Sequence, residues 1–422
     1  MAESIPATTT DGAEEEVGSS VERNSVLWLT NFSHAVNHFQ NEMLAVLYVT
    51  ILPDLGFSYT QLGALTAIRS VFGGAVQGLY GFLTPFLPRA WILGITNVIM
   101  GLGTLATGFA TSFNTFLGAR AVAAVGGSAQ HPVGYSLLAG YFPRARGAII
   151  ALNSSASNVG GLVAPLVAGA LLLIMGWRQV FMIVALVSVA MGLVYFLFRK
   201  QVAPANDPVG GRGRLVQGMD SYLRVFHNKN VILVSLVMMV GGAGRGLTVI
   251  FLAQHFARDL GLSTFMVSIA ITTMLAGGVV GPVALGWISD RVSRKGVIQV
   301  SLLLSTLATV WLAFQGAFLP LLLANMAIYG MVTRSRMSLT LAMVADSLPD
   351  ADRDAAFSVF STLGFVSAPL WIMLIATLME GQGFTVAFVT ISLSYLAGVF
   401  LMIFVKEVRS APVRESTVTS AS

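Results

Sequence analysis

The chain contains no cysteine, which excludes disulfide bonds and metal sites built on thiolates. It is also poor in charge, because only 10% of its 422 residues are Asp, Glu, Lys or Arg, whereas soluble proteins carry about a quarter. Hydrophobic residues make up 55% and the mean hydropathy is +0.78. This composition indicates an integral membrane protein. The basic residues behind the net charge of +5 are dispersed among loops, so we expect no nucleic-acid partner.

The two ends of the chain are polar, unlike the rest. Residues 1–25 are acidic and lack the basic start and apolar core of a signal peptide. Residues 407–422 are similarly polar. We therefore expect both segments to be disordered tails.

Long apolar runs recur along the remainder, and a bilayer core needs about 20 apolar residues per helix. They predict an all-α polytopic membrane protein with twelve transmembrane helices in two pseudo-symmetric six-helix bundles. The expected N-terminal bundle is residues 26–198, residues 199–230 form a polar linker, and the C-terminal bundle is residues 231–406. The spans lie near residues 26–52, 60–82, 90–110, 114–141, 148–173, 178–198, 231–256, 264–287, 296–314, 318–345, 354–379 and 384–405.

Basic residues orient these helices, because cytoplasmic loops of membrane proteins carry an excess of Lys and Arg. Nearly all the loop and tail cations fall on the side of the linker and the two ends, whereas the opposite loops hold only Arg178 and Arg258. We expect a multi-pass protein of the inner (cytoplasmic) membrane, with both termini and the linker in the cytoplasm.

The two halves share short matches on equivalent helices. The matched pairs, 204 or 205 positions apart, are Gly73-Gly74 with Gly277-Gly278, Ala164-Pro165-Leu166 with Ala368-Pro369-Leu370, and Gly56-Phe-Ser with Gly261-Leu-Ser. A parallel six-helix repeat is typical of secondary transporters, whose site lies near the midplane between the halves.

Motifs at the ends of three spans point to a family. The loop after the eighth span reads GWISDRVSRK from Gly286 to Lys295, the fourth span begins with GARAVAAVGG, and the sixth begins with GWRQVF. In these motifs the chain resembles the major facilitator superfamily, over essentially all twelve spans. The resemblance implies that the first, fourth, seventh and tenth helices line a central cavity.

The same resemblance implies a charged gate on the cytoplasmic side, which we assign to Asp290, Arg291 and Arg294. Arg120 in the fourth span is also a family-type residue, and we expect it to act in gating or structure. The loop after the second span departs from the pattern, since Pro85 replaces the aspartate that stands in the second half at Asp290. A charged gate is therefore implied by one half only.

Two stretches resemble the fosmidomycin-resistance type of exporter within that superfamily. One is His34-Ala-Val-Asn37 in the first span, and the other is GGSAQHP in the fourth, ending at His131-Pro132. That type has an acid after the asparagine, where this chain has His38. In the fifth span NVGGLVAPLVAG loosely resembles an antiporter motif, with Ala164 where a glycine is expected. These likenesses would favour export or exchange.

A polar stripe runs along the first span, with His34, Asn37, His38, Asn41 and Glu42 at i, i+3, i+4, i+7 and i+8. We expect it to line an internal cavity and bind substrate. Two alternatives stay open, a buried polar network that locks helices together and a metal site of His-x-x-x-His type. We assign no metal and no cofactor, because two histidines and one acid need further ligands. Glu42, the only acid near mid-membrane, and His38 are expected to carry a coupled proton.

Arginines within the spans cost about 2.5–3.5 kcal/mol each in lipid, so they must face protein or a wet cavity. In the fourth span Arg120 and His131 are eleven residues apart, which places them on one face, and Pro132 should kink the helix beside His131. In the tenth span Asn325 and Arg336 repeat this spacing.

Tyr329 and Thr333 extend the face of Arg336, so we expect all three to contact substrate. Arg334 lies about 200° away on the same helix, where helix pairing or snorkelling is as good an explanation as ligand contact. Arg69 in the second span and Arg245 in the seventh are further candidates for substrate binding.

This predicted site is cationic, and guanidinium groups bind carboxylates and phosphates through paired donors. We expect a monomeric secondary active transporter of a small organic anion, of carboxylate or phosphonate type, that works by alternating access and is proton-coupled or exchanging. The alternative within transport is a multidrug exporter of lipophilic or cationic compounds, for which Glu42 would be the only acid. A polytopic membrane enzyme or receptor is the alternative from another class, but we find no cofactor motif and no sensing domain.

Overall fold

The structure is a computed structural model that describes residues 19–77, 80–83, 87–142, 145–198, 223–244, 247–349 and 352–407. Most of the predicted linker, most of both predicted tails, Pro85 and Arg245 lie outside the described residues. All regular secondary structure in the described ranges is helical.

Each predicted span of the N-terminal half is a helix or an interrupted helix over its described residues. In chain order these are α1 (Ser20–Glu42) with α2 (Leu44–Leu55), α3 (Tyr59–Gln77) with α4 (Tyr80–Leu83), α5 (Arg89–Gly108), α6 (Phe113–Gly127) with the π-helix η1 (Gln130–Gly134) and α7 (Tyr135–Tyr141), α8 (Arg146–Leu171), and α9 (Trp177–Leu197).

The C-terminal half follows the same plan. Its elements are α11 (Lys229–Val240) with the 3₁₀ turn η3 (Gly241–Gly244) and α12 (Leu247–Arg258), α13 (Thr264–Arg291), α14 (Arg294–Phe314), α15 (Leu319–Asp346), α16 (Arg353–Gln382) and α17 (Phe384–Phe404). Seven of the described helices are long and apolar enough to cross a membrane by length and composition.

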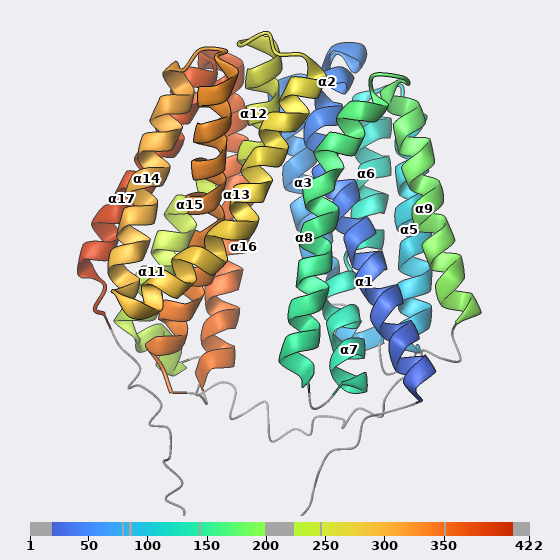
Figure 1. The fold of residues 1–422 in the computed structure, drawn as a ribbon, viewed down its shortest axis with the longest axis horizontal. Coiled ribbons are helices and arrows are strands. Elements are labelled where there is room, and N and C mark those ends of the chain that lie inside the picture. Colours follow the sequence, from blue (N-terminus) through green and yellow to red (C-terminus); the bar gives the residue numbers. More distant parts are fainter. Residues whose placement is uncertain are drawn as a thin grey trace, which may run out of the picture.

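The helices form two bundles side by side, α1 to α9 in one and α11 to α17 in the other (Figure 1). Their packing repeats, because α5 contacts α6 and α9 in the first bundle just as α14 contacts α15 and α17 in the second. The contacts between the two bundles also come in an equivalent pair, since α3 packs on α16 and α8 packs on α13. These are the second and fifth helices of one half against the fifth and second of the other, which confirms the predicted pseudo-symmetric fold.

Glycine explains one of the sequence matches between the halves. Gly56 ends α2 with φ of 66°, and Gly261 follows α12 with φ of 65°. Residues with a side chain rarely adopt this left-handed conformation, so both positions require glycine to turn the chain out of the helix. Equivalent turns therefore carry the repeated sequence.

The bundles approach most closely at the end where α2 and α12 lie and contact each other, at the top of Figure 1. There the Thr60 amide donates to Glu380 Oε2 at 3.1 Å, and the Tyr59 and Phe384 rings lie 5.1 Å apart. We refer to this as the closed end.

Close helix approach at the closed end depends on a small residue on α3. A Cβ added at Gly63 would lie 2.4 Å from the Cβ of Ala376 on α16, far inside contact distance. We expect Gly63→Val to disfavour this conformation, because α3 and α16 must separate. The cysteine-free background allows one reporter cysteine, Ala368→Cys in the wall between the bundles, to be labelled with an impermeant thiol reagent added from the closed end.

Labelling should be faster in Gly63→Val than in the unsubstituted reporter. Gly118→Val is the matched control, since nothing lies within 4 Å of a Cβ there. Equal labelling rates in the two valine variants would refute the role assigned to Gly63.

Candidate functional site

A cavity of about 340 Å³ lies between the bundles. Its wall comes mostly from the first half and includes Asn37, His38, Gln40, Asn41 and Glu42 of α1, Thr66, Arg69, Gly73 and Gln77 of α3, Met100 of α5, Arg120, Ala123, Ala124 and Gly127 of α6, the adjoining Ser128 and His131, and Ala368 and Ile372 of α16. The first and fourth spans thus line the cavity as expected. Among described residues, the seventh and tenth do not.

Most of the α1 stripe faces this cavity, and part of it also locks helices together. Arg69 Nη1 donates to Asn41 Oδ1 at 2.8 Å, and Asn41 Nδ2 donates to Asn37 Oδ1 at 3.2 Å. Asn37 in turn donates to the Gly127 carbonyl at 2.9 Å. This chain of hydrogen bonds ties α3 and α6 to α1 and fixes Arg69 against the wall. The two interpretations of the stripe, cavity lining and helix locking, therefore both apply.

Gln40, also on α1, locks helices together. Its Oε1 accepts a hydrogen bond from Thr104 at 2.6 Å, and its amide donates to Ser188. Gln40 is fully paired to α5 and α9 and is 2% exposed, so its part in the wall is structural.

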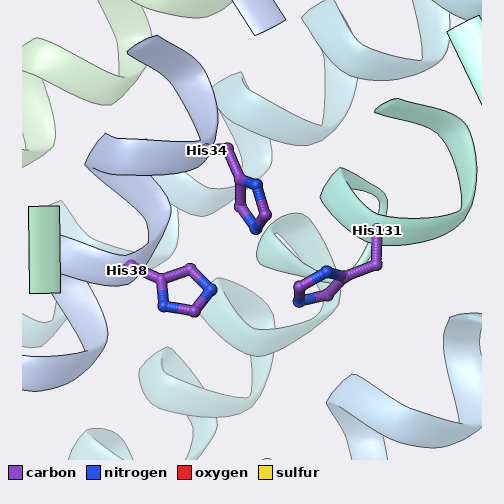
Figure 2. Close-up of side chains that lie close together, drawn as sticks. All are labelled: His34, His38 and His131. Atoms are coloured by element: carbon purple, nitrogen blue, oxygen red, sulfur yellow. The ribbon is translucent and has the colours of Figure 1, made fainter. Parts of the chain in front are cut away.

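Three histidines meet at one edge of the cavity. His34 and His38 come from α1 and His131 from η1, and Figure 2 shows their rings converging on one space. The ring centroid of His34 lies 4.9 Å from that of His38 and 4.8 Å from that of His131. His34 itself is fully buried, while His38 and His131 reach the cavity.

The predicted kink beside His131 is a break in the fourth span. Helix α6 ends at Gly127, and after a short turn the chain continues as the π-helix Gln130–Gly134, which contains Pro132. Proline has no amide hydrogen to donate, and π-helical turns are common at functional sites. Despite the break, Arg120 and His131 still line the same cavity, as their spacing predicts.

Glu42 meets a cation from the other half of the protein. Its Oε1 lies 3.7 Å from Nη2 of Arg334 on α15, and both side chains remain partly exposed. Gly278 makes room for this arginine, since a Cβ there would lie 2.1 Å from Arg334 Cδ. Sequence reasoning left Arg334 without a partner, because the spacing of α15 does not reveal which acid the opposite bundle presents.

Arg336 does not take the position expected for it. It is 3% exposed, its guanidinium carbon lies 5.1 Å from the Tyr395 ring centroid on α17, and it is not part of the cavity wall. Tyr329 and Thr333 are also absent from this wall, and the Tyr329 hydroxyl lies 3.3 Å from that of Tyr395. The expected direction of this face is therefore wrong in this structure, because α15 turns it toward α17 and presents Arg334 to the first half. The roles of Arg336, Tyr329 and Thr333 in substrate binding stay predictions.

Arg120 is buried at 4% exposure yet lines the cavity. Its Nε and Nη1 have no hydrogen-bond partner among the described residues. The nearest aromatic ring, Phe181, is 6.0 Å from the guanidinium carbon. A buried cation without paired acceptors is costly, so an anion in the cavity would gain strongly from this side chain.

Two of the predicted gate residues, Asp290 and Arg294, form an ion-pair network within the second half. Arg294 pairs with Asp290 at 2.9 Å and with Asp346 at 2.7 Å, while Arg291 packs on the Trp287 ring at 3.6 Å. Sequence reasoning missed Asp346, which ends α15 and joins it to α14. Asp346 is the better shielded of the two acids, at 16% exposure against 62% for Asp290.

This difference gives a testable ranking. Asp346→Asn should lower the thermal unfolding midpoint of the purified protein more than Asp290→Asn, because exposed ion pairs contribute only about 0.2–1 kcal/mol. The double variant should behave like Asp346→Asn with a small addition. A larger effect from Asp290→Asn would contradict the ranking and indicate that Asp290 has a further partner in another conformation.

Comparison with known proteins gives one family match that covers most of the chain. A sequence profile described as Major Facilitator Superfamily matches residues 30–243 and 234–420. The chain is 26% identical over 181 residues to the probable L-galactonate transporter of Escherichia coli K12, covering 42% of this chain and 40% of that protein. It is 22% identical over 286 residues to the probable sulfoacetate transporter SauU of Cupriavidus necator, covering 65% of this chain and 66% of that protein.

Solved structures show the same fold. A bacterial homologue of the human lysosomal transporter Spinster, in an inward-facing and unoccupied conformation, matches with a TM-score of 0.75 at 19% identity, over 92% of this chain and 96% of that one.

Proposed function

This chain belongs to the Major Facilitator Superfamily, a family of transporters rather than enzymes, and we propose that it carries a small organic anion across the membrane. The proposed mechanism is alternating access, in which the two bundles rock about the central cavity and the anion moves with a proton or in exchange. We place the protein in the inner membrane with both termini in the cytoplasm, on the distribution of its loop cations.

The charge balance of the cavity carries this proposal. Arg69 and Arg120 stand on its wall, and the one acid there, Glu42, already has Arg334 as a partner. The excess of positive charge favours an anion, and guanidinium groups bind carboxylate or phosphonate oxygens in pairs. L-galactonate and sulfoacetate, after which two relatives are named, are both small organic anions.

Further residues complete the proposed binding site. Asn37, Asn41, His38 and His131 supply neutral hydrogen-bonding groups around the anion, and the fully buried His34 packs against both of these histidines. Arg336, with Nε and Nη1 unpartnered among described residues, and Arg245 are the candidates in the second half for a conformation that closes over the site. The likeness of His34, Asn37 and His131 to the fosmidomycin-resistance type supports export as the direction.

The Nε and Nη1 atoms of Arg120, which have no hydrogen-bond partner among the described residues, provide a direct test. Arg120→Lys keeps the charge but loses the planar fork, and a charge-assisted hydrogen bond contributes about 1.5–3 kcal/mol. We therefore expect anion binding to weaken by about 10- to 150-fold. Binding of L-galactonate and sulfoacetate to purified protein, followed by uptake into liposomes, measures the loss.

Arg178→Lys is the matched control, because Arg178 pairs with Asp54 away from the cavity. The measurement uses whichever of the two anions the unsubstituted protein binds. If Arg120→Lys binds that anion with unchanged affinity, Arg120 is excluded from the site.

The ion pair between Glu42 and Arg334 suggests how the anion and a proton are coupled. An anion drawn to Arg334 would compete with Glu42 for the guanidinium. Released from its partner, the Glu42 carboxylate would be an uncompensated charge, which binding of a proton would neutralise. Substrate and proton would then favour each other, and the coupling is reciprocal by thermodynamic necessity. His38, beside Glu42 on the cavity wall, is the second group proposed to hold this proton.

Glu42→Gln mimics the protonated form. We expect the variant to retain anion counterflow, which needs no net proton movement, and to lose accumulation driven by a pH gradient. Both assays are run on the same proteoliposomes. Glu22→Gln is the control, since it is the same change on the same helix, at a partly exposed capping position that tolerates glutamine. Full pH-driven accumulation in Glu42→Gln would move the coupling to the histidines or show that protons are not used.

A further inference from the structure

The three histidines at the edge of the cavity have the chemistry of a metal site. The possible ligand nitrogens of His34, His38 and His131 all lie within 4.8 Å of one another. A tetrahedral Zn²⁺ with bonds of about 2.0–2.1 Å holds imidazole nitrogens about 3.4 Å apart. Contraction by about 1.4 Å at most, within reach of side-chain rotation, would close the three rings on one ion.

The hydrogen bonds behind His34 prepare it as a ligand. Asn153 Nδ2 donates to Asn31 Oδ1 at 2.7 Å, which turns the Asn153 oxygen toward His34. That oxygen lies 2.6 Å from His34 Nδ1, so Nδ1 carries the proton and donates it. The lone pair of a neutral ring is then left on Nε2.

The second ring nitrogen of His34, Nε2, makes no hydrogen bond in the described structure. The side chain is fully buried, and Nε2 has no hydrogen-bond partner among the described residues. Its ring faces those of His38 and His131 (Figure 2). Metal-binding histidines commonly donate their second nitrogen to a fixed oxygen in this way, which orients the ring and increases its basicity. A buried, oriented and unpaired imidazole nitrogen is what a metal ligand requires.

We propose that His34, His38 and His131 bind one divalent transition-metal ion of the Zn²⁺ class, with its fourth coordination position open to the cavity. His38 and His131 reach the cavity wall, which supplies both a path of entry and the open position. Three imidazoles with a free fourth position are typical of zinc sites that exchange a ligand. Glu42 is not a ligand in this arrangement, because it faces Arg334.

The arginines around the histidines determine how one further substitution should change the metal affinity. Arg69 and Arg334 both act electrostatically on His38, and each would repel a dication. Removing the Arg69 charge should therefore strengthen metal binding while it weakens anion binding. In the intact cavity, an oxygen of the transported anion could fill the fourth position and offset this repulsion, a role that depends on the proposed function.

The test is metal titration of the purified, tag-free full chain with no anionic substrate present. Zn²⁺ binding is measured by calorimetry, and Co²⁺ is used as a probe because its visible absorption reports tetrahedral coordination. We expect one ion per chain, and at least tenfold weaker binding in His34→Gln, His38→Gln and His131→Gln. His227→Gln and His255→Gln, which alter the other two of the five histidines, should bind like the unsubstituted protein.

Three further variants separate ligation from a general structural effect. His38→Asp retains a ligand oxygen and should bind Zn²⁺ more tightly than His38→Gln. Asn153→Ala leaves all three ligands but releases the His34 ring, so affinity should fall by about 10- to 100-fold. Arg69→Gln should bind Zn²⁺ severalfold more tightly. Thermal unfolding of each apo variant verifies that it is folded.

Tight binding that survives His38→Gln and His131→Gln, or binding lost in the two control variants, would overturn the proposal and assign the metal to the surface. Absence of saturable binding would overturn it as well. Neither result bears on anion transport, which is measured separately and without metal, so this proposal and the proposed function fail independently.

Discussion

A polar group in the middle of a membrane has no water to hydrogen-bond, so it must meet a protein partner or a wet cavity. That constraint organises the first half of this protein. The polar side chains of α1 turn inward, where Asn37 and Gln40 are paired to neighbouring helices and His38, Asn41 and Glu42 face the cavity. One stripe thus provides both the attachment of α1 to its bundle and the chemistry of the site.

The two bundles share a fold but differ in what they contribute. The first supplies nearly all of the cavity wall, including Arg69 and Arg120, whereas the second supplies the network around Arg294. Part of this asymmetry is already present in the sequence, because the aspartate of the gate motif stands only in the second half at Asp290. Repetition of the helix packing has therefore not required repetition of the chemistry.

Glu42 and Arg334 form the ion pair that links the bundles beside the cavity. Because the pair is partly exposed and 3.7 Å apart, it is weak enough to be broken when the bundles move or an anion arrives. The three histidines, in contrast, all belong to the first half, on α1 and η1. The ion pair between the halves and the proposed metal site within one half thus both draw on α1.

Much of this was determined by the sequence alone. The length of the apolar runs gave the twelve spans, the repeated glycines gave the two halves, and the spacing on α1 gave the polar stripe, because each depends only on residues close together along the chain. Spacing along the chain directed Arg336 rather than Arg334 toward the cavity, but polar residues lie on both faces of α15, and the neighbouring helices set its rotation. The histidine cluster needed His131 to be brought from another helix by the break at Pro132, and the tautomer of His34 needed Asn153 from a third. Which polar groups meet is set by the packing of distant segments, and only the tertiary structure decided it.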